Sequence, residues 1–250
     1  MKRVVAFIAV GLFSCLFLFS MNPFSYPVET VFIDPGHGGQ DSGAVRNWDF
    51  APGGELMEKD VNLAISLILK DYLKQKAPSL DVVLTRSDDT FPSLQERSQL
   101  CYRTVLSPKT ASLFLSIHAN ASTNQSAEGF EVFTKPKDKQ VPIIDEKTPL
   151  LNIPLFASED NKTLNVQQME ENLKFAGNIE SSLAASFPSM EDRGIKEDDL
   201  YVLNACRTCA ALVEVGFISN REDALHLLDP AWQHNMAQAL GDAILKYVQR

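Results

Sequence analysis

The chain has 250 residues, with 23 lysines and arginines against 32 aspartates and glutamates, so its formal net charge is −9. Hydrophobic residues make up 45% of the chain and charged residues 22%, which is typical of a folded globular protein and excludes a mainly disordered one. An acidic chain without a lysine and arginine run beyond its second and third residues lacks the clustered positive surface that nucleic-acid binding requires. The length suits one well-buried domain, and the four cysteines are too few for a disulfide scaffold.

The first 21 residues have the pattern of an export signal. Lys2 and Arg3 give a basic start, and no charge follows from residue 4 to residue 21. The length of the apolar run is close to the lower limit for a membrane span, and the run lacks a clear small-residue cleavage site. A cleaved signal peptide and an uncleaved anchor therefore both stay open. Lipidation of Cys15 is a weaker third option. We assign residues 1–29 to a signal peptide or membrane anchor that contacts the membrane. The folded part is then exported, to the periplasm or to the outer side of the inner membrane.

Hydrophobic periodicity after the leader predicts strands that alternate with helices. Short β-branched and aromatic runs indicate strands, and apolar residues at helical spacing indicate helices. Ser93 and Glu96 have the spacing of a capping box. The predicted strands are 31–33, 81–85, 111–117, 129–134 and 210–215, and the predicted helices are 56–73, 93–106, 170–187 and 231–248. This order predicts an α/β fold with a mostly parallel, twisted sheet flanked by helices, in a single domain over residues 30–250.

One stretch, at about 135–168, does not fit this alternation. It is rich in proline, lysine and acidic residues and shows little periodicity. A connection of this length is usually functional or mobile. We expect an insertion on a compact fold.

Four polar residues stand where a parallel sheet would bring them together. His37 follows the first strand inside the sequence DPGHGG, His118 ends an apolar strand, and Glu214 interrupts the apolar strand LVEVGF. Glu58 opens the first long helix. Because ligands of open α/β sheets bind beyond the carboxyl ends of the strands, we expect these side chains to meet at that edge.

Two imidazoles and one carboxylate form a sufficient ligand set for catalytic zinc, with a fourth position left for water. The glycines around His37 would let a metal or a substrate come close to the backbone. Asp34 is a candidate to orient a ligand imidazole, although a role in capping the turn is equally consistent with its position.

Glu214 is the least expected residue in the sequence, since a carboxylate inside a buried strand is costly without a partner. It must be paired, be protonated, or face a cavity in which it has a task. Beside an activated water it could take up a proton and later deliver it to a leaving amine, which is typically worth ~10² to 10⁴ in rate.

Taken one at a time, these residues have ordinary structural explanations. A histidine at a strand end is often a turn or core residue, Glu58 would be favoured in the first turn of any helix, and Glu214 could belong to a buried ion pair. His226 and His234 fall on or beside the C-terminal helical pattern, and we expect surface or packing roles for both.

With these residues identified, the chain resembles the zinc-dependent N-acetylmuramoyl-L-alanine amidases of the amidase-3 family. The resemblance extends from Val31 to Val248, apart from the insertion, and its sequence markers stand in the family's order. They are VFIDPGHGGQDSGA at 31–44, GGELMEKDVNL at 53–63, LTRSDD at 84–89, LSIHANA at 115–121, GFEVF at 129–133 and LVEVGFISN at 212–220.

The resemblance implies a peptidoglycan or muropeptide substrate, cleaved at the amide between N-acetylmuramic acid and L-alanine. It implies Zn²⁺ held by His37, Glu58 and His118, with Glu214 as the catalytic glutamate. In some relatives an inserted helix covers the zinc until a partner protein moves it, so the 135–168 insertion is a candidate lid for an activator protein.

The chain departs from the family pattern at two places, Cys101-Tyr102 and the segment from Cys206 to Cys209. The second is a CxxC without a partner motif, for which a local disulfide or two packed thiols are both open. Three alternative functions are a zinc peptidase that cuts within the stem peptide, a catalytically inactive wall-binding module, and a serine-type carboxypeptidase. The last would need a Ser-x-x-Lys motif, which the sequence lacks.

Overall fold

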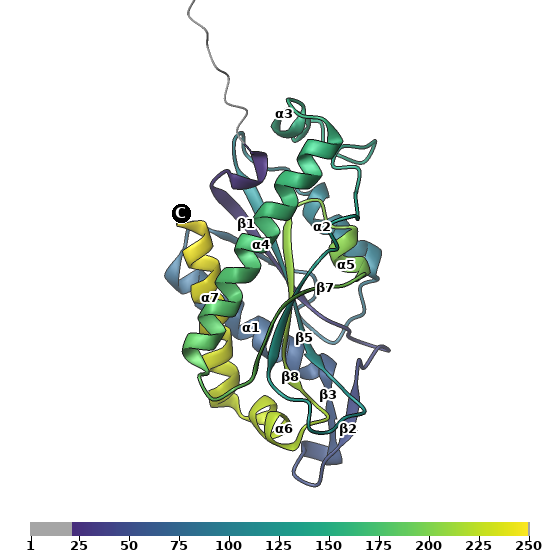
Figure 1. Ribbon diagram of the computed structural model, residues 1–250, viewed down its shortest axis with the longest axis vertical. Helices are drawn as coiled ribbons and strands as arrows, with labels where there is room; N and C mark the ends of the chain where they lie inside the picture. Colours follow the sequence, from purple (N-terminus) through teal and green to yellow (C-terminus); the bar gives the residue numbers. More distant parts are fainter. Residues whose placement is uncertain (1–21, 250) are drawn as a thin grey trace, which may run out of the picture.

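The computed structural model describes residues 22–249, which form a six-stranded sheet flanked by helices (Figure 1). Four strands are parallel; β6 runs antiparallel to β8, and β7 runs parallel to β6. The strand order across the sheet is β4 (Asp81–Leu84), β1 (Val28–Pro35), β5 (Ala111–Asn120), β8 (Cys209–Phe217), β6 (Phe130–Thr134) and β7 (Asp192–Glu197). The prediction of an α/β fold with a mostly parallel sheet is confirmed.

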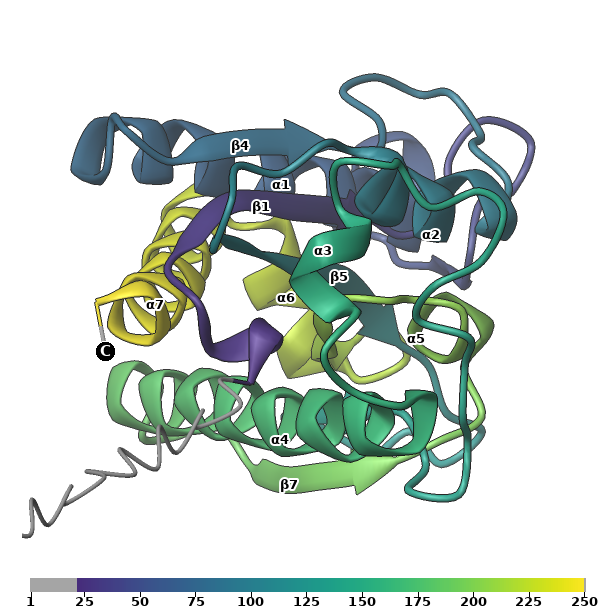
Figure 2. The ribbon, with the colours of Figure 1, turned by 90° about the horizontal axis from the view of Figure 1, so that it is seen from above.

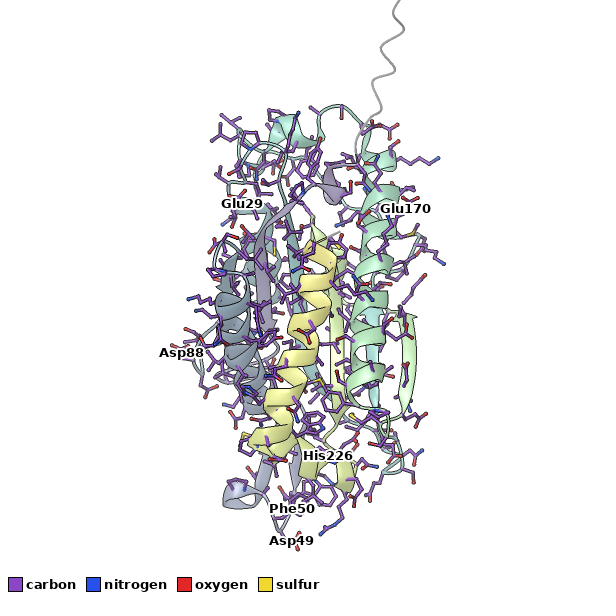
Figure 3. The ribbon with its side chains drawn as sticks, turned by 90° about the vertical axis from the view of Figure 1, so that its left-hand side faces the viewer. Glu29, Asp49, Phe50, Asp88, Glu170 and His226 are labelled. Atoms are coloured by element: carbon purple, nitrogen blue, oxygen red, sulfur yellow. The ribbon has the colours of Figure 1, made fainter. Side chains whose placement is uncertain are left out.

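Three long helices cover one face of the sheet, with α7 packed between the other two (Figures 1 and 3). Two shorter helices contact each other on the opposite face, beside the second hydrophobic cluster. The long helices are α1 (Glu58–Lys76), α4 (Asn161–Ser186) and α7 (Pro230–Val248), and the short ones are α2 (Leu94–Arg103) and α5 (Tyr201–Asn204). The remaining elements are η1 (Pro23–Ser25), β2 (Val45–Asn47), η2 (Pro52–Gly54), β3 (Glu55–Met57), α3 (Ile153–Phe156) and α6 (Arg221–Leu228).

The central strands are apolar on both sides because both faces of the sheet are covered. Ile33 and Leu115 belong to the large core under α1, α4 and α7, whereas Phe32 and Phe114 belong to the smaller core on the α2 and α5 side. Because successive side chains of a strand point to opposite faces of the sheet, each central strand contributes residues to both cores. The polar residues of interest for function lie where this apolar alternation stops, at the strand ends.

The predicted elements are present, with shifted ends. The capping box of α2 is formed: Ser93 Oγ accepts from the Glu96 amide at 3.2 Å, and Glu96 Oε2 accepts from the Ser93 amide at 2.8 Å. Helix α4 begins nine residues before the predicted start of 170, at Asn161, where Asp160 caps it. The first turns of α4 bury polar residues such as Gln168, so the sequence there does not show the spacing of apolar residues that indicates a helix.

Several elements are absent from the sequence prediction. Strand β7 has the sequence DRGIKE, in which no apolar alternation is visible, and it is an edge strand that needs none. The β2–β3 hairpin and helices α3, α5 and α6 are short, and short elements carry weak periodicity.

The insertion lies at the opposite end of the sheet from the carboxyl ends of the parallel strands. Because β6 runs antiparallel to β8, the chain leaves it at that far end, where α3 sits (Figures 1 and 2). There Asn152 accepts from the Leu106 amide and donates to the Thr104 carbonyl, and Ile143 is buried against Phe24. In this structure the segment does not cover the predicted metal site, so the expectation of a lid over that site is wrong. The last residues of the segment belong to α4.

The N-terminal part of the described chain packs on the same far end. Phe24 in η1 is 3% exposed, and residue 30, the expected start of the domain, lies inside β1. Of the leader predicted at 1–29, residues 1–21 lie outside the described residues, and residues 22–29 pack with the fold. Within residues 22–249, none of the helices is both long enough and apolar enough to cross a membrane.

Candidate metal centre and active site

Three potential metal ligands converge at the carboxyl edge of the sheet, each placed by a different element. His37 follows β1, His118 lies near the end of β5, and Glu58 is the first residue of α1. Glu58 Oε1 lies 3.1 Å from His37 Nε2 and 2.8 Å from His118 Nδ1. One ligand atom from each of the three residues lies within 4.8 Å of the others. The structure thus brings together the three residues that the sequence predicted as metal ligands.

Glu58 is held as a carboxylate. It is 5% exposed, and its oxygens accept from the amides of Ala44 at 2.9 Å and Ala119 at 3.3 Å. Burial alone would raise the pKa of Glu58, but the hydrogen bonds with His118 and His37 lower it well below its usual value. The carboxylate is therefore charged and ready to bind a cation.

The loop that carries His37 is strained and tightly held. His37 has a φ of 60°, a left-handed conformation that is uncommon for a residue with a side chain. Two buried arginines bind the carbonyl oxygens around it: Arg97 donates to Pro35 and His37, and Arg86 donates to Pro35 and Gly36. Strain of this kind persists only where the surroundings fix the conformation. Sequence reasoning missed these two arginines as supports of the site.

Two glycines make room for the ligands. A Cβ on Gly36 would lie 2.3 Å from the His118 ring, and a Cβ on Gly43 would lie 2.5 Å from Glu58 Oε2. Gly43 also has a φ of 63°, which suits glycine. The expected close approach around His37 is thus real at Gly36, whereas the need for Gly43 was not predicted.

Asp41, and not Asp34, orients a ligand imidazole. Asp41 Oδ2 lies 2.8 Å from His37 Nδ1, which leaves Nε2 toward Glu58. Asp34 is buried and accepts from Arg97 Nη1 at 2.7 Å and from the hydroxyls of Thr85 and Ser116. The suggested role of Asp34 beside an imidazole is therefore wrong, because its oxygens support the strand end below the His37 loop.

This donor set fits a divalent metal. Two neutral imidazole nitrogens and one charged carboxylate are the ligands that a catalytic zinc site takes from its protein. Burial lowers the pKa of His37, but the hydrogen bonds to Glu58 and Asp41 raise it overall, which favours a protonated His37 ring in the absence of a cation. Displacement of that proton would couple metal binding to pH.

Glu214 lies beside this triad, directly opposite His118 in the β5–β8 pairing. It is half-buried, and its Oε2 is a buried atom without a hydrogen-bond partner among the described residues. Burial, and then the charges of Glu58 and Glu131, raise the pKa of Glu214 well above its usual value. A carboxyl group with a buried, unpaired oxygen beside potential metal ligands is a candidate proton carrier.

A cavity of about 230 Å³ opens next to the two histidines, on the α2 side of the sheet. Its walls combine the metal end with apolar side chains: Phe91, Leu94 and Val202 line it together with His37 and His118. Phe91 and Leu94 are 41% and 51% exposed. The triad can therefore be reached by a substrate from this side.

The other candidate residues lie away from the site. Cys206 and Cys209 form no disulfide with each other, because they belong to the cores on opposite faces of the sheet. The packed thiols are the arrangement observed. His226 stacks on Trp232 at 5.8 Å between ring centroids, and His234 is exposed, as the sequence predicted.

Comparisons with known proteins agree with this geometry. Over 223 residues the chain is 35% identical to the uncharacterized protein YqiI of Bacillus subtilis, covering 88% of this chain and 86% of that protein. It is 34% identical to the N-acetylmuramoyl-L-alanine amidase LytC of the same organism, over 90% of this chain but only 37% of LytC.

A solved structure shares the fold. The catalytic domain of CwlV, an N-acetylmuramoyl-L-alanine amidase from Paenibacillus polymyxa, superposes with a TM-score of 0.66 at 30% identity, covering 89% of this chain and 99% of that domain. The family model described as N-acetylmuramoyl-L-alanine amidase, Amidase_3, matches residues 31–246. The chain therefore belongs to the amidase-3 family of N-acetylmuramoyl-L-alanine amidases.

Proposed function

We propose that this chain hydrolyses the amide between N-acetylmuramic acid and the L-alanine of the peptidoglycan stem peptide, with Zn²⁺ held by His37, Glu58 and His118. The observation that carries the proposal is the convergence of these three ligands, within 4.8 Å of one another, beside the unpaired Glu214. When bound, the metal supplies Lewis-acid activation of the carbonyl and of the attacking water.

Glu214 is the proton carrier in this proposal. It accepts a proton from the attacking water and delivers it to the departing amine of L-alanine, so that a neutral leaving group forms. Its position opposite His118 puts it next to the metal ligands and keeps it out of their coordination. Its unpaired Oε2 leaves it free of a hydrogen bond that would have to break first.

The surroundings of Glu214 adjust its basicity. Glu58 is one of the two carboxylates whose charge raises the pKa of Glu214. A divalent cation on Glu58 would offset that charge and lower the pKa of Glu214, which favours the charged carboxylate that can accept a proton. Asp41 would meanwhile keep the His37 ring in the tautomer that presents Nε2.

A defined muropeptide tests the proposal. We expect the zinc-loaded protein to release the intact peptide with a free N-terminal alanine, as measured by mass spectrometry, and a chelator to abolish the reaction. Glu214→Gln should retain zinc and lose hydrolysis by ~10² to 10⁴. Products cut between amino acids of the stem would favour the zinc peptidase instead, and an unaltered substrate with zinc bound would favour an inactive wall-binding module.

The proposal includes export of the folded domain by its N-terminal leader, because peptidoglycan lies outside the cytoplasmic membrane. Since residues 22–29 pack with the fold, the leader proposed here ends before them. An activator protein that binds the insertion remains part of the proposal. Since the insertion sits at the far end of the sheet from the triad, such an activator would have to act from a distance.

A further inference from the structure

A second group of charged residues lies next to Glu214. In the order of the strands it lies beyond Glu214, toward β6 and β7 and away from His37 and His118 at the ends of β1 and β5. Glu131 in β6 is directly opposite Glu214 in the β6–β8 pairing. Arg193 and Lys196 come from β7, the edge strand beyond β6. We refer to Glu131, Arg193 and Lys196 as the edge cluster.

The edge cluster places two cations on one buried carboxylate. Glu131 is 4% exposed, and its Oε1 accepts from Asn120 Nδ2 at 2.6 Å. Its Oε2 accepts from both Arg193 Nε, at 3.0 Å, and Lys196 Nζ. Two cations thus share one carboxylate oxygen, and burial of Glu131 is compensated by their hydrogen bonds.

Both cations keep surface open to a ligand. The side chains of Lys196 and Arg193 are 38% and 27% exposed. A lysine ammonium has three N–H donors and an arginine guanidinium five, so Glu131 uses only part of their capacity. Arg193 also lies 3.6 Å from Glu191 and over the Phe217 ring, whereas Lys196 lies over the Phe133 ring and has no second carboxylate partner among the described residues. Lys196 is therefore the better placed of the two to bind an added anion.

The spacing relates the edge cluster to the scissile amide. Neighbouring strands lie about 4.8 Å apart, so β7 is about 10 Å from the strand of Glu214, and Lys196 reaches back over part of that distance to touch Glu131. An extended peptide advances about 3.3 Å per residue. A peptide that starts at Glu214 and runs across β6 therefore brings its second residue to Lys196.

We propose that Lys196, assisted by Arg193, binds the carboxylate of the acidic residue that follows L-alanine in the stem peptide. The inference rests on the proposed function, because it takes the amide to lie between the metal ligands and Glu214. It gives the substrate a direction: the sugar lies toward the cavity beside Phe91, and the peptide crosses β6 toward β7. A residue that binds the peptide this way selects an anionic stem over a neutral one.

Two substrates that differ in one group test the inference. N-acetylmuramoyl-L-alanyl-D-isoglutamate has a free carboxylate at the second residue, and the D-isoglutamine analogue has a carboxamide there. We expect the zinc-loaded full-length protein to cleave the acid with a kcat/KM about tenfold higher, mainly through KM, since a charge-assisted hydrogen bond is lost in the amide.

Variants assign this preference to the edge cluster. Lys196→Gln should remove the preference by lowering kcat/KM for the acid alone, and Lys196→Arg should keep it. Lys139→Gln is the matched control, because Lys139 is also an exposed lysine paired with a carboxylate, Asp199, but belongs to the insertion. It should behave as wild type.

The outcomes separate the two proposals. Equal kcat/KM for both substrates in wild type, or an equal fall for both in Lys196→Gln, would overturn the carboxylate site while leaving the amidase function intact. An equal fall would mean that Lys196 acts through Glu131 on Glu214. Absence of hydrolysis of either substrate by the zinc-loaded wild type would overturn the proposed function itself.

Discussion

Two ionisable side chains, Lys135 at the far end of the sheet and Glu214 at the carboxyl end, differ in how their buried polar atoms are bonded. At the far end, Lys135 is 3% exposed and its Nζ is bound by Asn165 Oδ1 at 3.1 Å and Gln168 Oε1 at 2.5 Å. At the carboxyl end, Glu214 Oε2 is buried without a partner, and His37 has a left-handed backbone. Partnered polar groups stabilise a fold, and unpartnered ones are retained where they have a chemical task. The comparison sets a buried cation whose bonds stabilise the fold against a carboxyl group that lies unpaired beside the metal ligands.

The largest effect should follow from loss of a metal ligand. We expect His118→Ala to lose both zinc binding and hydrolysis, because two ligands and a water no longer hold the ion against competition from solvent. Metal analysis of the purified variant, together with its activity, checks this. His234→Ala, at an exposed position on α7, is the control and should retain both. A His118→Ala protein with full zinc content would contradict the assignment.

A smaller loss should follow from removal of the residue that orients a ligand. Asp41→Ala removes the hydrogen bond to His37 Nδ1, and we expect zinc affinity to fall about 10- to 100-fold. Competition with a chelating dye of known affinity measures it. Asp49→Ala is the control, because the Asp49 side chain is 84% exposed in the hairpin at the same end of the molecule (Figure 3). Equal affinity in the two variants would remove Asp41 from the site.

At the far end the expected effect is on stability and not on chemistry. Lys135→Ala leaves Gln168 Oε1 without its donor, and we expect a loss of about 1–3 kcal/mol in the free energy of unfolding, with zinc binding unchanged. Denaturant titration measures the change. Lys137→Ala, which removes an exposed lysine 3.3 Å from Glu197, should cost less than about 1 kcal/mol. A loss of zinc affinity in Lys135→Ala would show that the two ends are coupled.

The smallest effect should be a gain. The pKa of Glu214 is raised above 4.5 in the folded protein by its burial and by Glu58 and Glu131, so above pH 4.5 the folded state binds more protons than the unfolded state. Stability conferred by protonated Glu214 is therefore lost as the pH rises from 4.5 through the folded pKa. Glu214→Gln should stabilise the metal-free protein at pH 7 and leave its free energy of unfolding unchanged at pH 4, as measured by denaturant titration at the two pH values. A pH-independent difference would contradict this account.

Sequence reasoning found the site because its residues break strong local patterns. His118 and Glu214 interrupt apolar strands, and parallel strands place such residues at one edge. The same reasoning missed Arg86 and Arg97, because they bind backbone carbonyls that are far away in the sequence. It also missed Asp41, which contacts the His37 ring within a turn. Long-range hydrogen bonds leave no periodic signal.

The insertion shows the limit most clearly. Its composition indicated a segment outside the regular fold, and residues 135–160 are indeed irregular apart from α3. Its place at the far end is set by the reversed direction of β6, and nothing in the local sequence of β6 distinguishes an antiparallel strand from a parallel one. Strand direction is a property of the sheet as a whole.

The central claim is that His37, Glu58 and His118 hold zinc, and X-ray absorption at the zinc edge of the zinc-loaded protein tests it most directly. The account predicts one zinc per chain, bound by nitrogen and oxygen at about 2.0–2.2 Å with the multiple-scattering signature of two imidazoles. Zinc with sulfur neighbours at about 2.3 Å, or a protein that holds less than one equivalent after dialysis, would contradict it.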